Sequence, residues 1–195
     1  MGIFCGGNGF RLAVITKNQK QELFEAGKTS DLLAPKILEL LDKCNISVGE
    51  LEKIVVGVGP GSFTGSRVAV SFVKGLCCGN KNIAVVPFNT FEFLGFGKKC
   101  DAVLVPAFSD FVFVKKGDDE SCIEYAKAFS GNIVADEQTF GRWGKGKRVL
   151  PNEDFLNFVE YKAKQKGLKA KDLKPVYLRA SQAEIEREKR NGNKN

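Results

Sequence analysis

The chain has 195 residues, of which 43% are hydrophobic and 27% are charged, a composition typical of a folded globular protein. It has no apolar run of membrane-spanning length, and residues 1–10 lack the basic start and apolar core of a signal peptide. The absence of histidine excludes histidine zinc sites and the Ser-His and Cys-His nucleophile systems. We therefore expect a cytoplasmic protein without imidazole chemistry.

Cysteine usage and charge add two expectations. The six cysteines form no C-x-x-C pair, so we predict small buried hydrophobes and no metal site. Residues 1–140 carry 15 basic and 16 acidic side chains, whereas residues 141–195 carry 15 basic and 7 acidic ones. The basic C-terminal part has two interpretations: attraction to nucleic-acid phosphates, or a solvated lysine-rich helix and tail. No aromatic residue interleaves the lysines at 162–171, so any contact there would be nonspecific.

The first predicted elements are two strands and a helix. Residues 11–15 and 22–25 read as an opening hairpin with a turn at 17–20. Ser30 is a candidate N-cap for the helix that follows, and Pro35 implies that this helix kinks or begins near Ala34. The apolar residues at helical spacing are Leu33, Ile37, Leu40, Leu41 and Cys44.

A strand, a glycine-rich turn and a helix then follow one another directly, with only short connections between them. Residues 54–56 are a β-branched run that predicts a buried strand, and the helix runs over 64–78. In the turn, three glycines allow positive φ or close backbone approach, Pro60 fixes one φ, and Ser62 or Thr64 can cap the helix. Such a helix N-terminus can hold a phosphate, although the same loops occur where a helix packs tightly on a sheet.

Both helices carry apolar arcs wider than one sheet requires. At 100° per residue the apolar residues of helix 64–78 span about 200°. Either the helices are buried within the domain, or two adjacent helices with surplus apolar surface form half of a four-helix interface. The candidate interface residues are Leu33, Ile37, Leu40, Leu41, Ser66, Val70, Val73, Lys74 and Cys77.

A second unit is expected after Gly79. Its predicted elements are a strand at 83–86 ending at Pro87, a short helix at 89–96, strands at 102–105, 111–115 and 123–126, the last two paired, and a further strand at 133–135.

The loop at 141–147 is a near-match to a Walker A box. Gly141, Gly146 and Lys147 have the required spacing, but Arg148 replaces the Ser or Thr that would hold magnesium. A strand, not a helix, is predicted to follow. We therefore expect a surface turn, with Trp143 packed beneath it or exposed for contact.

The segment G-P-G-S-F-T-G at 59–65, followed by Arg67, Lys74, Gly75 and Leu76, resembles the signature of the bacterial TsaB (YeaZ) family. P-V-Y-L-R-A at 175–180 resembles its closing P-x-Y-L-R segment. The resemblance is strong over 30–93 and 174–181 and weak between them. It implies an α/β, two-lobed actin-like ATPase fold (ASKHA, ribonuclease H-like). The expected parts are an N-terminal lobe of residues 1–80 with the partner-binding helices, a smaller second lobe of 81–180 and a basic tail of 181–195.

Two departures from the family pattern indicate a degenerate fold. Family members open with a strand ending in a D-T-S-like turn, whereas residues 6–9 here are G-G-N-G, so the first strand is expected to be shortened or missing. The family's D-A-R-x-x-x-V-Y stretch is present only as P-A-F-S-D-F-V-F at 106–113. The carboxylates and second phosphate loop that an actin-like ATPase needs are not found, so no catalytic residue is predicted.

The resemblance implies a noncatalytic subunit that binds and stabilises or activates the TsaD transferase, which adds threonylcarbamoyl to the tRNA adenosine beside the anticodon. Other expected partners are a TsaE-type ATPase in a larger complex, a second copy of the chain when TsaD is absent, and tRNA through residues 141–195, with no membrane. No tightly bound cofactor is expected, and ATP or ADP at the TsaD interface is left open. The signature residues expected at the interface or on a nucleotide are Gly59, Pro60, Gly61, Ser62, Phe63, Thr64, Gly65 and Arg67.

Three alternatives remain open on the sequence. The chain could be an autonomous ASKHA-type kinase or ATPase, a basic tRNA-binding module, or a purely homodimeric scaffold. ATP turnover by the purified chain would favour the first, and tight, salt-sensitive tRNA binding would favour the second. A homodimer that persists in the presence of TsaD would favour the third.

Overall fold

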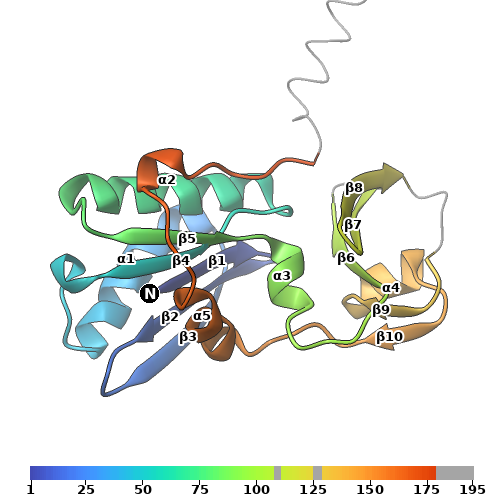
Figure 1. Ribbon diagram of the computed structural model, residues 1–195, viewed down its shortest axis with the longest axis horizontal. Coiled ribbons are helices and arrows are strands. Elements are labelled where there is room, and N and C mark those ends of the chain that lie inside the picture. The colour runs from blue at the N-terminus through green and yellow to red at the C-terminus, as the bar shows by residue number, and fades with distance from the viewer. Residues whose placement is uncertain (108–110, 125–128, 179–195) are drawn as a thin grey trace, which may run out of the picture.

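The computed structural model describes residues 1–107, 111–124 and 129–178 (Figure 1). In chain order the elements are β1 (Gly2–Gly6), β2 (Gly9–Ile15), β3 (Lys20–Ala26), α1 (Thr29–Lys43), η1 (Val48–Glu50), β4 (Lys53–Gly57), α2 (Phe63–Gly79), β5 (Ala84–Phe88), α3 (Thr90–Leu94), β6 (Ala102–Pro106), β7 (Phe111–Lys116), β8 (Asp119–Glu124), β9 (Asn132–Val134), α4 (Glu137–Trp143), β10 (Lys147–Val149), α5 (Phe155–Ala163) and η2 (Ala170–Asp172). None of the helices in these ranges has the length and hydropathy needed to cross a membrane.

The strands form two five-stranded sheets with the same internal order. The first sheet runs β3-β2-β1-β4-β5, with β1, β2 and β3 antiparallel and with β4 and β5 parallel to β1. The second runs β8-β7-β6-β9-β10 with the same pattern of directions. Two sheets of one topology indicate a duplicated unit, as the predicted actin-like fold requires.

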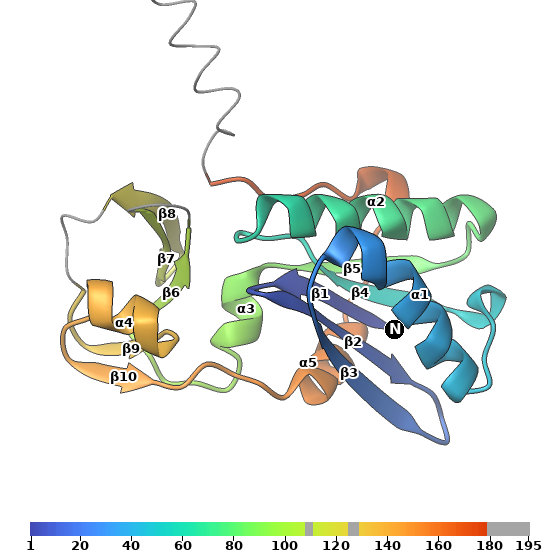
Figure 2. The ribbon, with the colours of Figure 1, turned by 180° about the vertical axis from the view of Figure 1, so that it is seen from behind.

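Helices cover both faces of the first sheet (Figure 2). α1 and α2 pack side by side on one face and share a core with the inward residues of β1, β2 and β4. On the other face α5 packs against the sheet over a phenylalanine cluster, in which ring centroids lie 4.8–6.4 Å apart. Each such aromatic pair contributes about 0.5–1.5 kcal/mol beyond its buried area. The cluster consists of Phe4, Phe88, Phe93, Phe155 and Phe158.

The lobe boundary predicted at residue 80 is wrong. β5 pairs in parallel with β4, with Val86 opposite Val55, so it completes the first sheet. α5 also returns from the C-terminal part of the chain to pack on that sheet (Figure 1). The second lobe is therefore built on the sheet of residues 102–149, and the predicted tail at 181–195 lies outside the described residues.

The first strand, expected to be shortened or missing, is present, so the second of these alternatives is wrong. β1 has five residues and lies at the centre of its sheet between β2 and β4. Gly2 lies against the side chain of Val159 on α5, which leaves no room for a Cβ there. Of residues 6–9, which suggested a loop, Gly6 belongs to β1 and Gly9 to β2, and only Gly7 and Asn8 form the turn into β2.

Several predicted boundaries also shift. α1 begins at Thr29 and continues through Pro35, so Ser30 is not its N-cap and the helix does not begin near Ala34. β5 continues through Pro87 rather than ending there. β8 covers 119–124 rather than 123–126, because its turn lies at Gly117, and residues 125–126 lie outside the described residues.

The Walker-like segment is partly helical. Residues 141–143 form the last turn of α4, so the surface turn predicted there is shorter, and β10 follows it as predicted. Trp143 is buried, so it packs beneath the turn.

Candidate functional site: the signature loop and the interlobe cleft

The signature loop is held between two distant segments of the chain. Val176 N donates a hydrogen bond of 2.8 Å to the Val58 carbonyl, and Thr90 N donates one of 2.8 Å to the Gly59 carbonyl. Gly59 has φ +103°, and a Cβ there would lie 2.9 Å from the Val176 carbonyl oxygen. Glycine is thus required at 59 by both conformation and close approach.

The cap of α2 is Ser62. Its hydroxyl oxygen accepts a hydrogen bond of 3.1 Å from Gly65 N, so of the two predicted candidates Ser62, not Thr64, satisfies a free amide at the helix start. A Cβ on Gly65 would lie 3.3 Å from Cys5 of β1. The beginning of α2 therefore lies very close to the first strand.

Arg67 links the signature to the closing segment of residues 174–178. Its Nε donates a hydrogen bond of 2.8 Å to the Tyr177 hydroxyl, and its guanidinium carbon lies 3.8 Å from the Phe63 ring centroid. The Phe63 and Tyr177 rings are themselves 5.0 Å apart. Sequence reasoning identified both segments by resemblance but did not name Tyr177 as a site residue, because no local pattern shows that the two segments meet.

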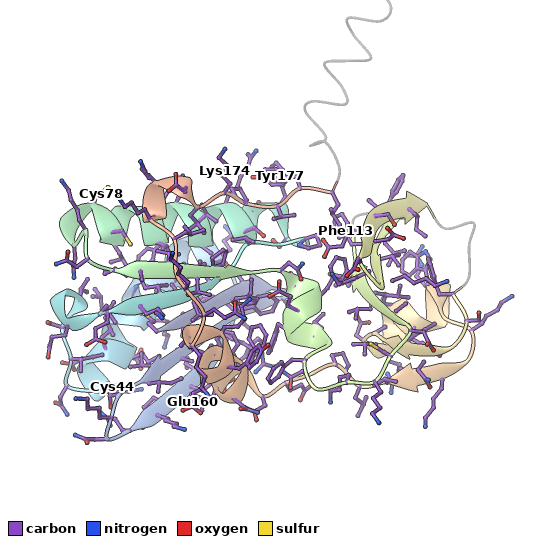
Figure 3. The ribbon with its side chains drawn as sticks, in the orientation of Figure 1. Cys44, Cys78, Phe113, Glu160, Lys174 and Tyr177 are labelled. Carbon is purple, nitrogen blue, oxygen red and sulfur yellow. The ribbon has the colours of Figure 1, made fainter. Side chains whose placement is uncertain are left out.

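A cleft of about 1500 Å³ lies between the two lobes beside this cluster. Its lining comes from the β1–β2 turn, the signature loop, the end of β6 and the closing segment. Figure 3 shows Phe113 on the second lobe, and Tyr177, also part of the lining, on the first. The signature residues that line the cleft are Pro60, Gly61, Ser62, Phe63 and Arg67, whereas Gly59, Thr64 and Gly65 do not.

The described lining of the cleft contains two carboxylates, Asp136 and Glu153. Asp136 caps α4, where its oxygens accept hydrogen bonds of 2.8 Å from Thr139 N and 2.7 Å from Thr139 Oγ1. Across the described ranges, no three histidine, cysteine or carboxylate side chains gather as metal ligands would. The arrangement can hold an apolar or aromatic group beside an arginine, but its described residues do not present the carboxylate set that positions magnesium for phosphoryl transfer.

Eight of the nine predicted interface residues lie in the core of the chain itself. Leu33, Ile37, Leu40 and Leu41 of α1 face the sheet with at most 5% of their surface exposed. Ser66, Val70, Val73 and Cys77 of α2 are at most 7% exposed. Only Lys74 is half-buried. Direct contact of those eight side chains with a partner is not available in this fold, so the prediction is corrected: they hold α1 and α2 on the sheet.

Other apolar residues of these helices do reach the surface. Leu38 of α1 is 58% exposed. Val68, Phe72 and Leu76 of α2 are only partly buried and, four residues apart, form one stripe along the helix.

Comparison with known proteins finds similarity to proteins named for tRNA threonylcarbamoyladenosine biosynthesis. A family model described as TsaD, tRNA N6-adenosine threonylcarbamoyltransferase, matches residues 25–109. The tRNA threonylcarbamoyladenosine biosynthesis protein TsaB of Bacillus subtilis is 35% identical over 75 residues, which cover 38% of this chain and 32% of that protein. TsaB of Buchnera aphidicola is 30% identical over 81 residues, covering 40% of this chain and 37% of that protein. The matched part spans about a third of the length of these relatives.

Solved structures match almost the whole chain. YeaZ from Pseudomonas aeruginosa has a TM-score of 0.70 at 18% identity, covering 91% of this chain and 98% of that one. A protein with similarity to the peptidase YeaZ, from the same organism, has a TM-score of 0.68 at 19% identity with the same coverage. The repeated topology and these neighbours define a two-lobed protein of the actin-like ATPase fold. Within that class, the resemblance to the TsaB (YeaZ) family predicted from the signature is confirmed, and named members of that family act in tRNA threonylcarbamoyladenosine biosynthesis.

Proposed function

We propose that the chain is a noncatalytic subunit required for threonylcarbamoyl modification of the tRNA adenosine beside the anticodon, and that it acts by binding and stabilising or activating a TsaD-type transferase. The observation that carries the proposal is that the TsaD family model matches residues 25–109 in a chain that is also similar to the TsaB proteins of Bacillus subtilis and Buchnera aphidicola. This segment contains α1, β4, the signature loop and α2. Two proteins that share a similar structural unit can pair by packing the corresponding surfaces of that unit together, as two identical copies do about a two-fold axis.

The cleft supports the noncatalytic role. Arg67 interacts with Phe63 and Tyr177 of the same chain, and Asp136 caps α4. Both of these charged groups therefore already have an internal structural role. We propose that no cofactor is bound tightly and that ATP or ADP, when it binds, lies at the interface with the transferase.

The outer side of the α1–α2 pair is the proposed partner surface. On α1, Lys36 lies 3.5 Å from Glu25, so this side of the helix faces β3. Leu38 comes two positions later, which is a rotation of about 200° around the helix axis. Leu38 therefore lies on the opposite flank, toward α2. On α2, Leu76 lies half a turn round the helix from Arg67, which faces the closing segment. The stripe of Val68, Phe72 and Leu76 therefore borders Leu38, and together they form an apolar surface that two further helices can cover.

In this proposal the same surface binds the transferase and, in its absence, a second copy of the chain. A TsaE-type ATPase would join the larger complex, and the basic C-terminal part would contact tRNA.

Co-purification and light scattering with the TsaD homologue of the same organism test the proposal. The wild-type chain is expected to form a one-to-one species, and Leu38→Glu is expected to weaken pairing at least tenfold while the melting temperature stays unchanged. Leu150→Glu, on the second lobe, is the matched control because Leu150 is 64% exposed. Independent elution of the two wild-type proteins would refute the pairing, and unchanged pairing of Leu38→Glu would refute the surface. ATP turnover by the chain alone would support the kinase alternative instead.

A further inference from the structure

A lysine-rich segment, residues 164–174, connects α5 to the surface of α2. It carries five lysines and one acidic residue, Asp172. In Figure 1 this basic strap rises from α5 across the β5 edge of the first sheet and reaches α2, against which η2 packs. The lysines are Lys164, Lys166, Lys169, Lys171 and Lys174.

The backbone of the basic strap is fixed to the sheet edge. Leu168 and Val85 exchange two backbone hydrogen bonds of 2.8 and 3.0 Å, which extends the sheet by one bridge. A Cβ on Gly167 would lie 2.8 Å from the Ala84 Cβ, so the strap lies directly against β5. Lys53 Nζ donates hydrogen bonds of 2.7 Å to the Ala163 carbonyl and 3.1 Å to the Gln165 carbonyl, which holds the start of the strap.

The packing of the strap places all five lysines on the outside. Leu168, Ala170 and Leu173 pack against the core of the first lobe, and Leu173 is only 1% exposed. The lysines between and beside them are exposed, and Figure 3 shows Lys174 at the surface beside α2. Because the apolar residues anchor the backbone, the cations form a fixed linear array rather than a freely moving tail.

These cations have no ionic partners within the described ranges. None of the five lysines lies within 4.0 Å of a carboxylate oxygen there. Some other lysines of the lobe are paired: Lys20 with Glu160, and Lys36 and Lys43 both with Glu39. The strap thus gathers five cations without an ionic partner among the described residues on one continuous segment.

We propose that the basic strap binds the phosphate backbone of RNA, which under the proposed function is the tRNA brought to the transferase. A narrow, fixed row of cations fits a linear polyanion, whose phosphates it contacts without reading sequence. Anionic lipid surfaces are recognised by helices that also present large apolar side chains. No large hydrophobic residue of the strap is exposed.

Binding of an unmodified, fluorescein-labelled tRNA transcript to the full chain at several salt concentrations tests this assignment. The variant Lys166→Gln/Lys169→Gln/Lys171→Gln is expected to bind at least tenfold more weakly at about 100 mM salt. The slope of log K against log salt should become shallower by about 2–3, since each phosphate contact contributes about 0.7–0.9. The control, Lys17→Gln/Lys28→Gln/Lys43→Gln, removes the same charge from exposed positions across the lobe and should bind like wild type.

Three results would overturn the assignment. One is an equal loss of RNA affinity in the strap and control variants, which would show that binding depends only on the net charge of the chain. Another is loss only when the basic residues of the C-terminal end are neutralised, in Arg187→Gln/Lys189→Gln/Arg190→Gln, positions outside the described residues. The third is strap-dependent binding to phosphatidylserine vesicles with no binding to RNA.

The assignment of RNA as tRNA rests on the proposed function, but the two fail separately. The strap variant should still pair with the TsaD homologue, and Leu38→Glu should still bind RNA. If the wild-type proteins do not pair while strap-dependent RNA binding persists, the proposed function fails and the RNA surface stands. If they pair and the strap variant binds RNA like wild type, only the strap assignment fails.

Discussion

Arg67 in the signature donates a hydrogen bond of 2.8 Å to the hydroxyl of Tyr177, which lies 110 residues later in the chain. The same guanidinium lies over the Phe63 ring, and the Val176 amide is bonded to the Val58 carbonyl next to the loop. The closing segment therefore packs on the signature loop and the start of α2 and holds them in place. The two sequence segments that carry the family resemblance form one structural unit.

Substitutions at Arg67 and Tyr177 should have small, coupled effects. Tyr177→Phe removes the hydrogen bond but keeps the ring, so unfolding in urea should show a loss of about 0.5–1.5 kcal/mol. Arg67→Ala also removes the contact with Phe63, which adds about 0.5–1 kcal/mol. The double variant should lose less than the sum of the two single losses, because both remove one bond. Strict additivity would show that Arg67 and Tyr177 contribute independently.

The corrected position of Val70 gives a second test. Val70 is 4% exposed in the core between α2 and the sheet, so Val70→Glu buries a carboxylate without a partner and should cost about 3 kcal/mol or more. Ser71→Glu, one position later on the exposed side, should change the free energy of unfolding by about 0.5 kcal/mol or less. Circular dichroism during thermal unfolding measures both. A folded, stable Val70→Glu chain would mean that Val70 is not in the core and lies on the partner surface, as first predicted.

The local pattern around the signature was sufficient to predict the strand, the turn, the helix and a capping hydroxyl at Ser62 or Thr64. β-branched residues at 54–56, glycines with special backbone conformations and a capping hydroxyl all act within a few residues, so they can be recognised without tertiary structure. The family resemblance then supplied the fold class.

The errors came from contacts between distant segments. β5 joins the first sheet and α5 returns to cover it, and neither relationship is encoded near residue 80. The apolar arc of α2 was correctly judged too broad for one sheet, but periodicity does not show which part faces the sheet, α1 or η2. Similarly, Gly6 and Gly9 suggested a loop because the close approach of Phe4 to the first and of the β3 backbone to the second is not visible in the sequence.

The glycines of α2 provide a paired test of this packing. Gly75 is exposed in the helix, and a Cβ added there would meet no atom within 4 Å, so Gly75→Ala should stabilise the chain by about 0.5–1 kcal/mol through helix propensity. Gly65→Ala would place its methyl group 3.1 Å from Ser62 Oγ and 3.3 Å from Cys5. That variant should gain less than Gly75→Ala or lose stability. Equal stabilisation by both, measured by urea unfolding, would contradict the close approach of α2 to β1.

Lys162 of α5 and Glu92 of α3 form an ion pair of 2.7 Å, in which the lysine side chain is only 8% exposed. Glu92→Gln leaves the lysine charge buried without a carboxylate partner, so the free energy of unfolding should fall by about 1–3 kcal/mol. Because Glu92 is partly exposed, this loss should be smaller than the loss for a fully buried ion pair. The double variant Glu92→Gln/Lys162→Met, which removes the charge, should recover most of this loss. No recovery would mean that the loss does not come from the uncompensated charge of Lys162.

The cysteines should differ sharply in reactivity toward a disulfide reagent such as DTNB. Burial raises the pKa of the Cys5 thiol from 9.0 to about 12, whereas Cys78 is exposed on α2. Because the thiolate is the nucleophile, Cys78 should react first at about pH 8, and Cys5 should react only when the chain unfolds. Cys78→Ser should therefore abolish the fastest phase, and Cys5→Ser should leave it unchanged. Raising the pH from about 7 to about 9 should still leave Cys5 protected, because its raised pKa keeps the thiol protonated there. A fast phase that depends on Cys5 would show that α2 and β1 separate readily at the signature loop.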